Sequence, residues 1–471
     1  MKHHQVDVAV IGAGSAGLAA FRAAGKGGGR VLLIEAGPFG TTCADHGCMP
    51  SKVLLAAANG LYRARHLGPR GIVGLDELHA QSAEVMEYVR AERDHFVSGV
   101  LDEMRDIPAA QIMRGRARFV SGTTLVVTTE QGDEHTVQAR GIVIATGALP
   151  VIPEEFKVFG SRLLTSDTLF EVTELPRRVA VFGAGPIALE LGQALSRLGV
   201  SVHMFGRAGK VGGISDPAVS SELVRALQAE FYFDPDAQIL DMTLTDAMPT
   251  VHYRALTGDT ATTEFDAVLV GTGRRPVLKG LELENSGLSL DEHGVPEFDP
   301  VTRRCGDSVI FMAGDCDARR PWLSDAVDEG ARAGAGAACV PDAVYGKQKA
   351  ALAIVFCEPQ IALVGVDYAA LPKNGFVMGT VSFENQGRSR VMRENRGCLH
   401  IYADAHTGRL LGAQGCGPAL EHLAHLLAWA VQLELKVQDM VNLPFYHPVV
   451  EEGLRTALRQ AVNALRKHGY P

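Results

Sequence analysis

The sequence predicts an α/β fold, because an apolar strand, a glycine-rich turn, a helix and a second strand follow one another twice along the chain. The first copy covers residues 6–37 and the second covers residues 178–209. The length of 471 residues is a third observation, since it allows about three domains. We therefore expect two domains built on these copies and one further region.

The first copy has the spacing of a dinucleotide-binding turn. Gly12, Gly14 and Gly17 lie between strand and helix, and Glu35 ends the next strand 18 residues after Gly17. Such glycines let the backbone approach a pyrophosphate at the helix N-terminus, and the carboxylate binds a ribose hydroxyl. The pattern is weak alone but strong in this context, so it predicts a Rossmann-like domain. A glycine-rich turn without a ligand is the alternative.

The second copy repeats this turn but lacks the acid. The three positions are occupied by Gly183, Gly185 and Ala188. The position that corresponds to Glu35 is Gly206, and Arg207 follows it. An arginine near this position accommodates a 2′-phosphate, so the spacing favours NADPH, or loose selectivity, over strict NADH. Arg207 could equally be a solvated surface residue.

Two further strands end in glycine turns, within residues 140–153 and 265–280, and are expected to be chain crossings between domains. Another strand ends at Gly314 and Asp315, where a carboxylate could hold a hydroxylated cofactor chain. A helix start is the alternative role for Asp315.

Composition limits the partners. The chain is 46% hydrophobic and 21% charged, as in ordinary globular proteins, and its net charge of −9 without a basic run disfavours nucleic acid. No apolar run reaches membrane-spanning length and no signal peptide precedes the first strand, so we expect a cytoplasmic protein with no membrane partner. His3 and His4 are expected to be tail residues.

Residues 40–52, GTTCADHGCMPSK, hold Cys43 and Cys48 with four residues between them. Five residues along a helix rise about 7.5 Å, so a disulfide here requires a bent loop. Asp45 and Gly47 supply the bend. The apolar spacing after Cys48 predicts a helix whose N-terminus favours a thiolate, and Lys52 adds positive charge one turn later.

A redox-active disulfide is therefore favoured over inert thiols and over a metal site. A metal site needs two more ligands at matching spacing, and the other cysteines form no second close pair in the sequence. We expect no metal, and we expect ordinary buried or surface thiols at Cys305, Cys316, Cys339, Cys357, Cys398 and Cys416.

With these motifs in order, the chain resembles the pyridine nucleotide-disulfide oxidoreductases over essentially its full length, and within them the dihydrolipoamide dehydrogenases. The matching segments include TTCADHGCMPSK, GAGPIALELG, VLVGTGRRP, FMAGD and YHPVVEEGLRTAL. The resemblance implies FAD on the first turn and NAD or NADP on the second. It also implies an FAD-binding domain at 1–150 and 276–341, an NAD(P)-binding domain at 151–275, and a C-terminal α+β domain at 342–471 that forms a homodimer.

The resemblance also implies roles for six side chains. Cys48 would lie against the flavin, Cys43 would exchange with substrate, and Lys52 would pair with Glu190. His447 and Glu452 would form an acid–base pair donated by the other subunit. Thiol–disulfide exchange independently favours a histidine of near-neutral pKa, oriented by a carboxylate. Pro448 is expected to start the helix that follows His447.

The expected cofactor contacts follow from the same motifs. For FAD they are Gly12, Gly14, Ser15, Ala16, Gly17, Glu35, Thr42, Lys52, Ala145, Thr146, Gly147, Gly314 and Asp315. For the pyridine nucleotide they are Gly183, Gly185, Pro186, Ile187, Arg207 and Gly273. Four residues depart from the family pattern and place substrate or nucleotide preference in question: Thr41, Pro186, Tyr446 and Val449.

The expected activity is that of a dihydrolipoamide dehydrogenase, with a small-molecule or lipoyl-protein dithiol as substrate. Two alternatives stay open. One is an NADPH-dependent disulfide reductase similar to glutathione reductase, although Ser51 stands where those enzymes normally carry lysine. The other is an FAD-binding signalling or scaffold protein without turnover.

Overall fold

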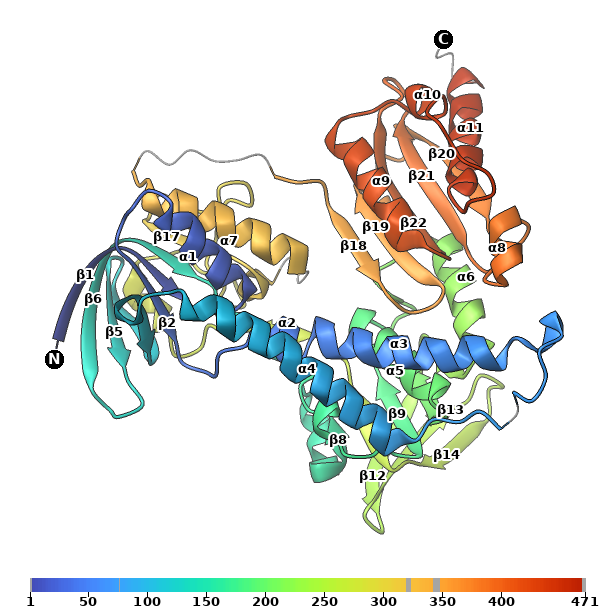
Figure 1. Cartoon of the computed structure of the whole chain (residues 1–471), viewed down its shortest axis with the longest axis horizontal. Helices are drawn as coiled ribbons and strands as arrows, with labels where there is room; N and C mark the ends of the chain where they lie inside the picture. Colours follow the sequence, from blue (N-terminus) through green and yellow to red (C-terminus); the bar gives the residue numbers. More distant parts are fainter. Residues whose placement is uncertain (1, 76, 319–322, 342–347, 468–471) are drawn as a thin grey trace. The chain divides into compact units, whose positions relative to one another are not determined.

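The computed structural model describes residues 2–75, 77–318, 323–341 and 348–467. Its contacts divide the chain into two compact units, each made of several segments (Figure 1). The first unit contains residues 1–50, 88–151 and 274–348, and the second contains 51–87, 152–273 and 349–471. The domain boundaries given above, including one at residue 342 outside the described residues, stay predictions.

The first unit is built on a seven-stranded sheet of order β3-β2-β1-β6-β5-β4, with β17 paired to β6. The bounds are β1 (Lys2–Ile11), β2 (Val31–Glu35), β3 (Ile112–Arg114), β4 (Arg116–Ser121), β5 (Thr124–Thr128), β6 (Glu134–Ile144) and β17 (Ile310–Met312). Strands β1, β2, β3, β6 and β17 pair in parallel, as a Rossmann-like core requires.

Strand β1 begins earlier than the sequence suggested. Lys2 pairs with His135, and the His4 ring lies 2.9 Å from the His135 ring. The expectation that His3 and His4 are tail residues was therefore wrong, because β6 is long enough to pair with the chain from its second residue.

Helices α1 (Ser15–Gly25) and α7 (Leu323–Ala338) pack closely in this unit. A side chain at Gly330 would come within 2.1 Å of the Ala16 carbonyl oxygen, and one at Gly334 equally near that of Ala20. Glycine at these two positions lets the helices touch backbone to backbone.

The two predicted crossings lie together in the first unit. Strand β7 (Ala148–Pro150) pairs antiparallel with β16 (Arg274–Pro276). The Arg274 guanidinium also donates to the Ala148 carbonyl at 2.6 Å. Segments more than one hundred residues apart are therefore joined where the chain leaves and re-enters this unit.

The second unit contains a parallel sheet of order β11-β10-β9-β15-β8. Its strands are β8 (Leu163–Leu164), β9 (Arg178–Phe182), β10 (Ser201–Phe205), β11 (Tyr232–Asp234) and β15 (Ala267–Val270), with helices α5 (Pro186–Arg197) and α6 (Pro217–Gln228). An antiparallel meander follows, made of β12 (Ile239–Thr245), β13 (Met248–Arg254) and β14 (Thr260–Glu264). This is the second Rossmann-like domain.

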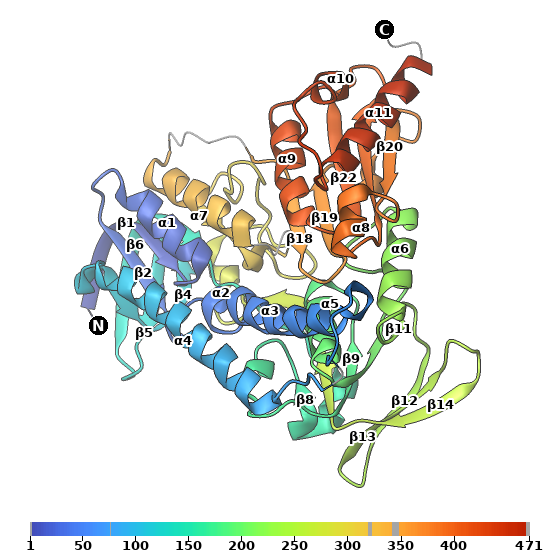
Figure 2. The ribbon, with the colours of Figure 1, turned by 45° about the vertical axis from the view of Figure 1, so that its right-hand side comes forward.

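The C-terminal part of the second unit is an antiparallel sheet of order β18-β19-β22-β21-β20. Its strands are β18 (Leu352–Val355), β19 (Gln360–Gly365), β20 (Phe376–Ser382), β21 (Cys398–Asp404) and β22 (Leu410–Gly417), and its helices are α8 (Gly387–Met392), α9 (Leu420–Gln432), α10 (Val437–Met440) and α11 (Glu452–Lys467). Figures 1 and 2 both show α9 and α11 lying along this sheet.

Alternation along β21 decides what each face of this sheet touches. Leu399, Ile401 and Ala403 belong to the apolar core with α9 and α11, whereas His400 and Tyr402 contact Asp216 at the start of α6.

The predicted fold class, two Rossmann-like domains and a C-terminal α+β domain, is confirmed. Among the described residues, no helix is long and apolar enough to cross a membrane.

Candidate active site

The two cysteines predicted to react lie where one short helix ends and a longer one begins. Cys43 is in α2 (Thr42–Asp45) and Cys48 is the first residue of α3 (Cys48–Arg65), and both are half-buried. A side chain at Gly47 would approach the Thr42 carbonyl oxygen to 2.6 Å and the Cys43 Cα to 3.3 Å. Glycine at 47 therefore lets the chain fold back, so that the residue before Cys48 touches the backbone of Cys43.

Thr41 starts this arrangement in a strained conformation. Its φ of 60° and ψ of 143° lie in a region that favours glycine, the residue that the family resemblance leads us to expect at this position. Holding a β-branched residue there costs about 1–3 kcal/mol. The Thr41 hydroxyl accepts a hydrogen bond from the Ala44 N–H at 3.3 Å, which partly offsets that cost by capping α2.

Lys52 and Glu190 form the predicted pair. The Lys52 ammonium donates to the Glu190 carboxylate at 2.7 Å, and Glu190 is only 6% exposed. The second Glu190 oxygen accepts from the Phe356 N–H at 2.8 Å, and the ammonium lies 4.9 Å from the Phe356 ring centre. Glu190 therefore holds Lys52 one turn after Cys48 and anchors the end of β18.

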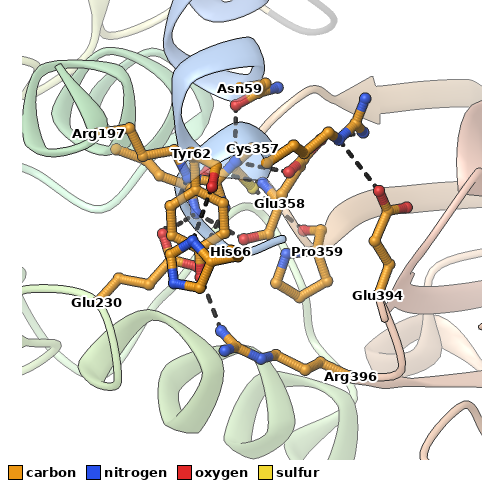
Figure 3. A network of polar contacts seen from close by, with 12 residues as sticks. Asn59, Tyr62, His66, Arg197, Glu230, Cys357, Glu358, Pro359, Glu394 and Arg396 are labelled. Atoms are coloured by element: carbon orange, nitrogen blue, oxygen red, sulfur yellow. Dashed lines mark hydrogen bonds and ion pairs between the residues drawn. The ribbon is translucent and has the colours of Figure 1, made fainter. Parts of the chain in front are cut away.

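Two further polar side chains of α5 were not anticipated from the sequence. Gln193 pairs with both the N–H and the carbonyl of Glu358. Arg197, buried to 2% exposure, bonds Glu230 and Glu358 and stacks on the Tyr62 ring at 4.0 Å (Figure 3). Burial opposes the charge of Arg197, but Glu230 outweighs it and the pKa is raised.

The signal for these residues was available. Positions 190, 193 and 197 recur at helical spacing on a helix that is otherwise largely apolar, so three polar residues share one buried face. Together they fasten α5 to α3 and to the turn between β18 and β19.

The residues expected to bind FAD form a cradle that fits the cofactor. A side chain at Gly12 would lie 2.2 Å from the Ala145 oxygen, whereas at Gly14 it would meet nothing within 4 Å. Helix α1 begins at Ser15 and Ala16 with no side-chain cap, so its N–H groups are available to a phosphate. The Glu35 carboxylate is fixed by the N–H groups of Ala13 and Gly37, at 2.6 and 2.7 Å.

Polar groups beside this glycine turn also fit FAD. The Thr146 hydroxyl is buried without a hydrogen-bond partner among the described residues, beside Gly147 with its positive φ of 69°. Asp315 lies in the turn after β17, where burial raises its pKa. Behind it, the Glu329 carboxylate accepts from the Gly314 N–H at 3.0 Å, and Arg303 bonds both Glu329 and Asp317.

The second nucleotide turn has the same construction. A side chain at Gly183 would lie 2.3 Å from the Gly271 oxygen, whereas Gly185 and Gly273 have nothing within 4 Å. Pro186 begins α5, which has no side-chain cap, and Ile187 is 37% exposed. This turn fits a dinucleotide pyrophosphate.

The structure gives a reason for the missing acid at position 206. A side chain at Gly206 would lie 2.6 Å from the Pro235 carbonyl oxygen, so no glutamate fits there. Arg207 is exposed, and the next N–H, of Ala208, donates to Asp236 at 2.7 Å. The end of β10 therefore presents a cation where many dinucleotide sites present a carboxylate.

His447 and Glu452 are brought together. The His447 Nδ1 lies 3.0 Å from Glu452 Oε1, and this bond, with one from the Val449 N–H, lowers the pKa of Glu452. Helix α11 begins at Glu452, so the expectation that it starts at Pro448 was wrong. Residues 448–451 form a turn instead, and this turn returns the carboxylate to the ring. His447 and Tyr446 are exposed, Tyr446 to 81%.

The described part of the chain contains no group of three His, Cys, Asp or Glu side chains arranged to hold a metal ion.

Two family models cover most of the chain. Residues 6–330 match the pyridine nucleotide-disulphide oxidoreductase family, and residues 352–458 match the dimerisation domain of pyridine nucleotide-disulphide oxidoreductases.

Curated relatives extend along nearly the whole sequence. Dihydrolipoyl dehydrogenase from Halobacterium salinarum is 30% identical over 97% of this chain and 96% of its own length. Mercuric reductase from Shigella flexneri is 29% identical over 96% of this chain and 80% of its own length. The two relatives are named for different activities but are almost equally similar to this chain. Sequence identity alone therefore does not indicate which substrate this chain uses.

A solved structure has the same fold. The copper(II) complex of the HOCl-induced flavoprotein disulfide reductase RclA from Escherichia coli aligns with a TM-score of 0.82 at 21% identity, covering 97% of this chain and 99% of that one.

Proposed function

The chain belongs to the pyridine nucleotide-disulphide oxidoreductase family, and from this premise we propose that it is a dihydrolipoamide dehydrogenase-like enzyme. It is a flavoprotein that binds FAD and a pyridine nucleotide. The observation that carries the proposal is the tight Cys43–Gly47–Cys48 turn, followed one helical turn later by the Lys52–Glu190 pair. A flavoprotein that only signals or scaffolds needs none of these features.

Bound FAD supplies two-electron chemistry between the enzyme thiols and the nicotinamide. The protein's residues do the positioning. Gly12 and Gly14 allow the approach of the pyrophosphate, Asp315 and Thr146 offer polar contacts, and the N-terminus of α3 together with Lys52 favours a thiolate at Cys48.

The substrate step uses the disulfide form of Cys43 and Cys48. One substrate thiolate attacks the Cys43 sulfur, which forms a mixed disulfide and releases Cys48 as a thiolate. The second substrate thiol then attacks the substrate sulfur of that mixed disulfide, which releases the oxidised substrate and Cys43. Two electrons pass from the substrate to the protein disulfide, and two protons leave the substrate thiols.

His447 receives a proton from the substrate thiol, and Glu452 fixes the ring through Nδ1 and stabilises its charged form. We propose that this pair serves the Cys43–Cys48 disulfide of the partner subunit in a homodimer. The match of residues 352–458 to a dimerisation domain supports this arrangement. A lipoyl protein or small dithiol would then reach Cys43 past the exposed Tyr446.

A second candidate, an NADPH-dependent disulfide reductase, is favoured by one observation. The Pro235 carbonyl leaves no room for an acid at Gly206, while Arg207 is exposed beside it. That arrangement suits the 2′-phosphate of NADPH. NAD, the acceptor when dihydrolipoamide is oxidised, has no such phosphate.

Steady-state rates with dihydrolipoamide and with glutathione disulfide, each paired with NAD(H) and NADP(H), test the two candidates. We expect dihydrolipoamide to give the highest kcat/KM. Preference for glutathione disulfide with NADPH would establish the second candidate instead, and no turnover of any dithiol or disulfide would contradict both.

Replacing Arg207 tests the nucleotide preference separately. Arg207→Ala should lower kcat/KM for NADPH by about tenfold through loss of a charged hydrogen bond, with little change for NADH. Arg254→Ala, at another exposed arginine of the same unit, is the matched control. Equal losses with both nucleotides would remove Arg207 from the site.

A further inference from the structure

A second pair of cysteines lies in the C-terminal sheet. Cys398 begins β21 and Cys416 lies near the end of β22, and the antiparallel register places them directly opposite each other. Opposite residues in such a sheet have Cα atoms about 4.5–5.5 Å apart, within the range of disulfides. The Cys398 thiol also lies within hydrogen-bonding reach of Cys416. Two thiols that are 18 residues apart in the sequence are therefore in contact.

The strands approach closely at this pair. A side chain at Gly397, whose φ is 89°, would come within 2.1 Å of the Cys416 carbonyl oxygen. A side chain at Gly415 would come within 2.9 Å of the Cys398 carbonyl oxygen. Glycines next to both cysteines therefore let the two backbones, and the two thiols, draw together.

A histidine and a carboxylate adjoin the pair. The His400 ring contacts the Cys398 thiol, and its Nδ1 lies 2.7 Å from the Asp216 carboxylate. The Tyr402 hydroxyl donates to the same carboxylate at 2.9 Å. The result is a Cys416–Cys398–His400–Asp216 chain of contacts within the second unit.

A cavity reaches the same strand ends. It has a volume of about 160 Å³, and its lining includes Arg396, two residues before Cys398, and Gly417, the residue after Cys416. Figure 3 shows the polar network beside it, with Arg396 directed at Glu230. The lining thus includes a residue one or two positions along the chain from each cysteine, while Cys398 is only 7% exposed and Cys416 is fully buried.

We propose that Cys398 and Cys416 are a second redox site, which a small hydroperoxide oxidises to a cross-strand disulfide. With hydrogen peroxide, the Cys398 sulfur attacks one peroxide oxygen, the O–O bond breaks, and a sulfenic acid and one water form. The Cys416 sulfur then displaces the hydroxyl of the sulfenic acid, which leaves as a second water. With hydrogen peroxide, two thiols lose two electrons and two hydrogens, and the peroxide becomes two waters.

The surroundings set the order and the speed of these steps. Cys398 reacts first, because it is the less buried thiol and His400 adjoins it. The contact with Cys416 and burial raise the pKa of Cys398, whereas His400 acts in the opposite sense. Since the thiolate is the nucleophile, oxidation should be slower than that of Cys43 at the α2–α3 turn.

Peptide mapping of the full-length, FAD-loaded protein tests the proposal. Trypsin separates the two cysteines, because it cleaves after Arg396, Arg409 and Lys436. After treatment with hydrogen peroxide and alkylation of remaining thiols, we expect a disulfide between the peptides 397–409 and 410–436. Reduction with dithiothreitol should release both peptides.

Two comparisons make the result decisive. Cys357 is equally buried and is the neighbour of Glu358, which lines the same cavity, but no strand pairing of the described residues places a second cysteine opposite it. Its peptide should therefore form no disulfide at the same dose. In Cys416→Ser, Cys398 should stop at the sulfenic acid, which dimedone traps.

Retained flavin absorbance would show that the oxidised protein is still folded. A linked pair found only after unfolding in urea, or oxidation of Cys357 as fast as that of Cys398, would overturn the proposal. So would dimedone labelling of Cys398 that is equal in the wild type and in Cys416→Ser, since Cys416 would then not capture the sulfenic acid.

Discussion

Cys43 and Cys48 lie half-buried on a turn between two helices, whereas Cys398 and Cys416 face each other across two buried strands. Each cysteine pair is associated with a histidine–acid pair. For the first, we propose that His447 and Glu452 serve the cysteines of the partner subunit. For the second, His400 and Asp216 adjoin the cysteines in the same sheet region. The same residue types therefore occur twice in opposite environments. The first set has half-buried thiols and an exposed ring, whereas the thiols of the second set are buried, so we expect the second pair to react more slowly.

The largest expected effect separates the two pairs by activity. Cys43→Ser should lower dihydrolipoamide turnover by about 10⁴-fold or more, because Cys43 and Cys48 form one disulfide and neither can react with substrate as a disulfide without the other. Cys416→Ser should leave turnover nearly unchanged. Steady-state rates at equal flavin content measure the turnover of both variants. Similar losses in the two variants would contradict the assignment of the two cysteine pairs to separate sites.

The two histidines should differ nearly as much. His447→Gln should lower turnover by roughly 10³-fold, within the range for a lost general acid–base group. His400→Gln keeps a donor for Asp216 and should have a small effect on the rate. If His400→Gln proved the slower enzyme, the acid–base assignment would have to move to the buried pair.

The pH dependence of stability should follow the buried pair. Burial lowers the pKa of His400, but the hydrogen bond to Asp216 outweighs it and raises the pKa to about 9. A raised histidine pKa stabilises the fold fully below about pH 6.5, and this contribution is lost as the pH rises to about 9. The loss should be no more than about 3 kcal/mol.

Urea unfolding of the wild type and of His400→Gln at pH 6 and pH 9 measures this pH-dependent loss of unfolding free energy. The groups that face the ring are Asp216, Tyr402 and Cys398. The wild type should lose more unfolding free energy than the variant between the two pH values. Equal losses would assign the pH dependence to other groups.

The smallest effect concerns the glycine between the reactive cysteines. In Gly47→Ala the new methyl group meets the Thr42 carbonyl oxygen, so the turn must open by a fraction of an ångström. A misplacement of 1 Å can cost 10²-fold, so we expect about a tenfold loss in kcat. Gly60→Ala, on an open face of α3, is the control, since a side chain there meets nothing within 4 Å. Equal rates for both variants would show that the turn tolerates opening.

Local patterns predicted what depends on neighbours in the chain. The glycine turns at Gly12 and Gly183 and the helix after Cys48 follow from spacing and backbone sterics, and all three lie where expected. The start of α11 does not lie where expected. The turn after His447 is fixed instead by the Glu452 carboxylate, which accepts hydrogen bonds from the ring and from the Val449 N–H. The helix-start pattern alone does not specify which local hydrogen bonds form before α11.

The sequence by itself determined the two dinucleotide folds, the family resemblance and the Cys43–Cys48 turn, because each motif behind them consists of residues within about thirty positions of one another. Only the tertiary structure decided that Cys398 and Cys416 are a pair, since strand register joins residues that no spacing rule connects. It also decided that Gly206 has no room for an acid, because the obstacle is the backbone of Pro235 on a neighbouring strand end.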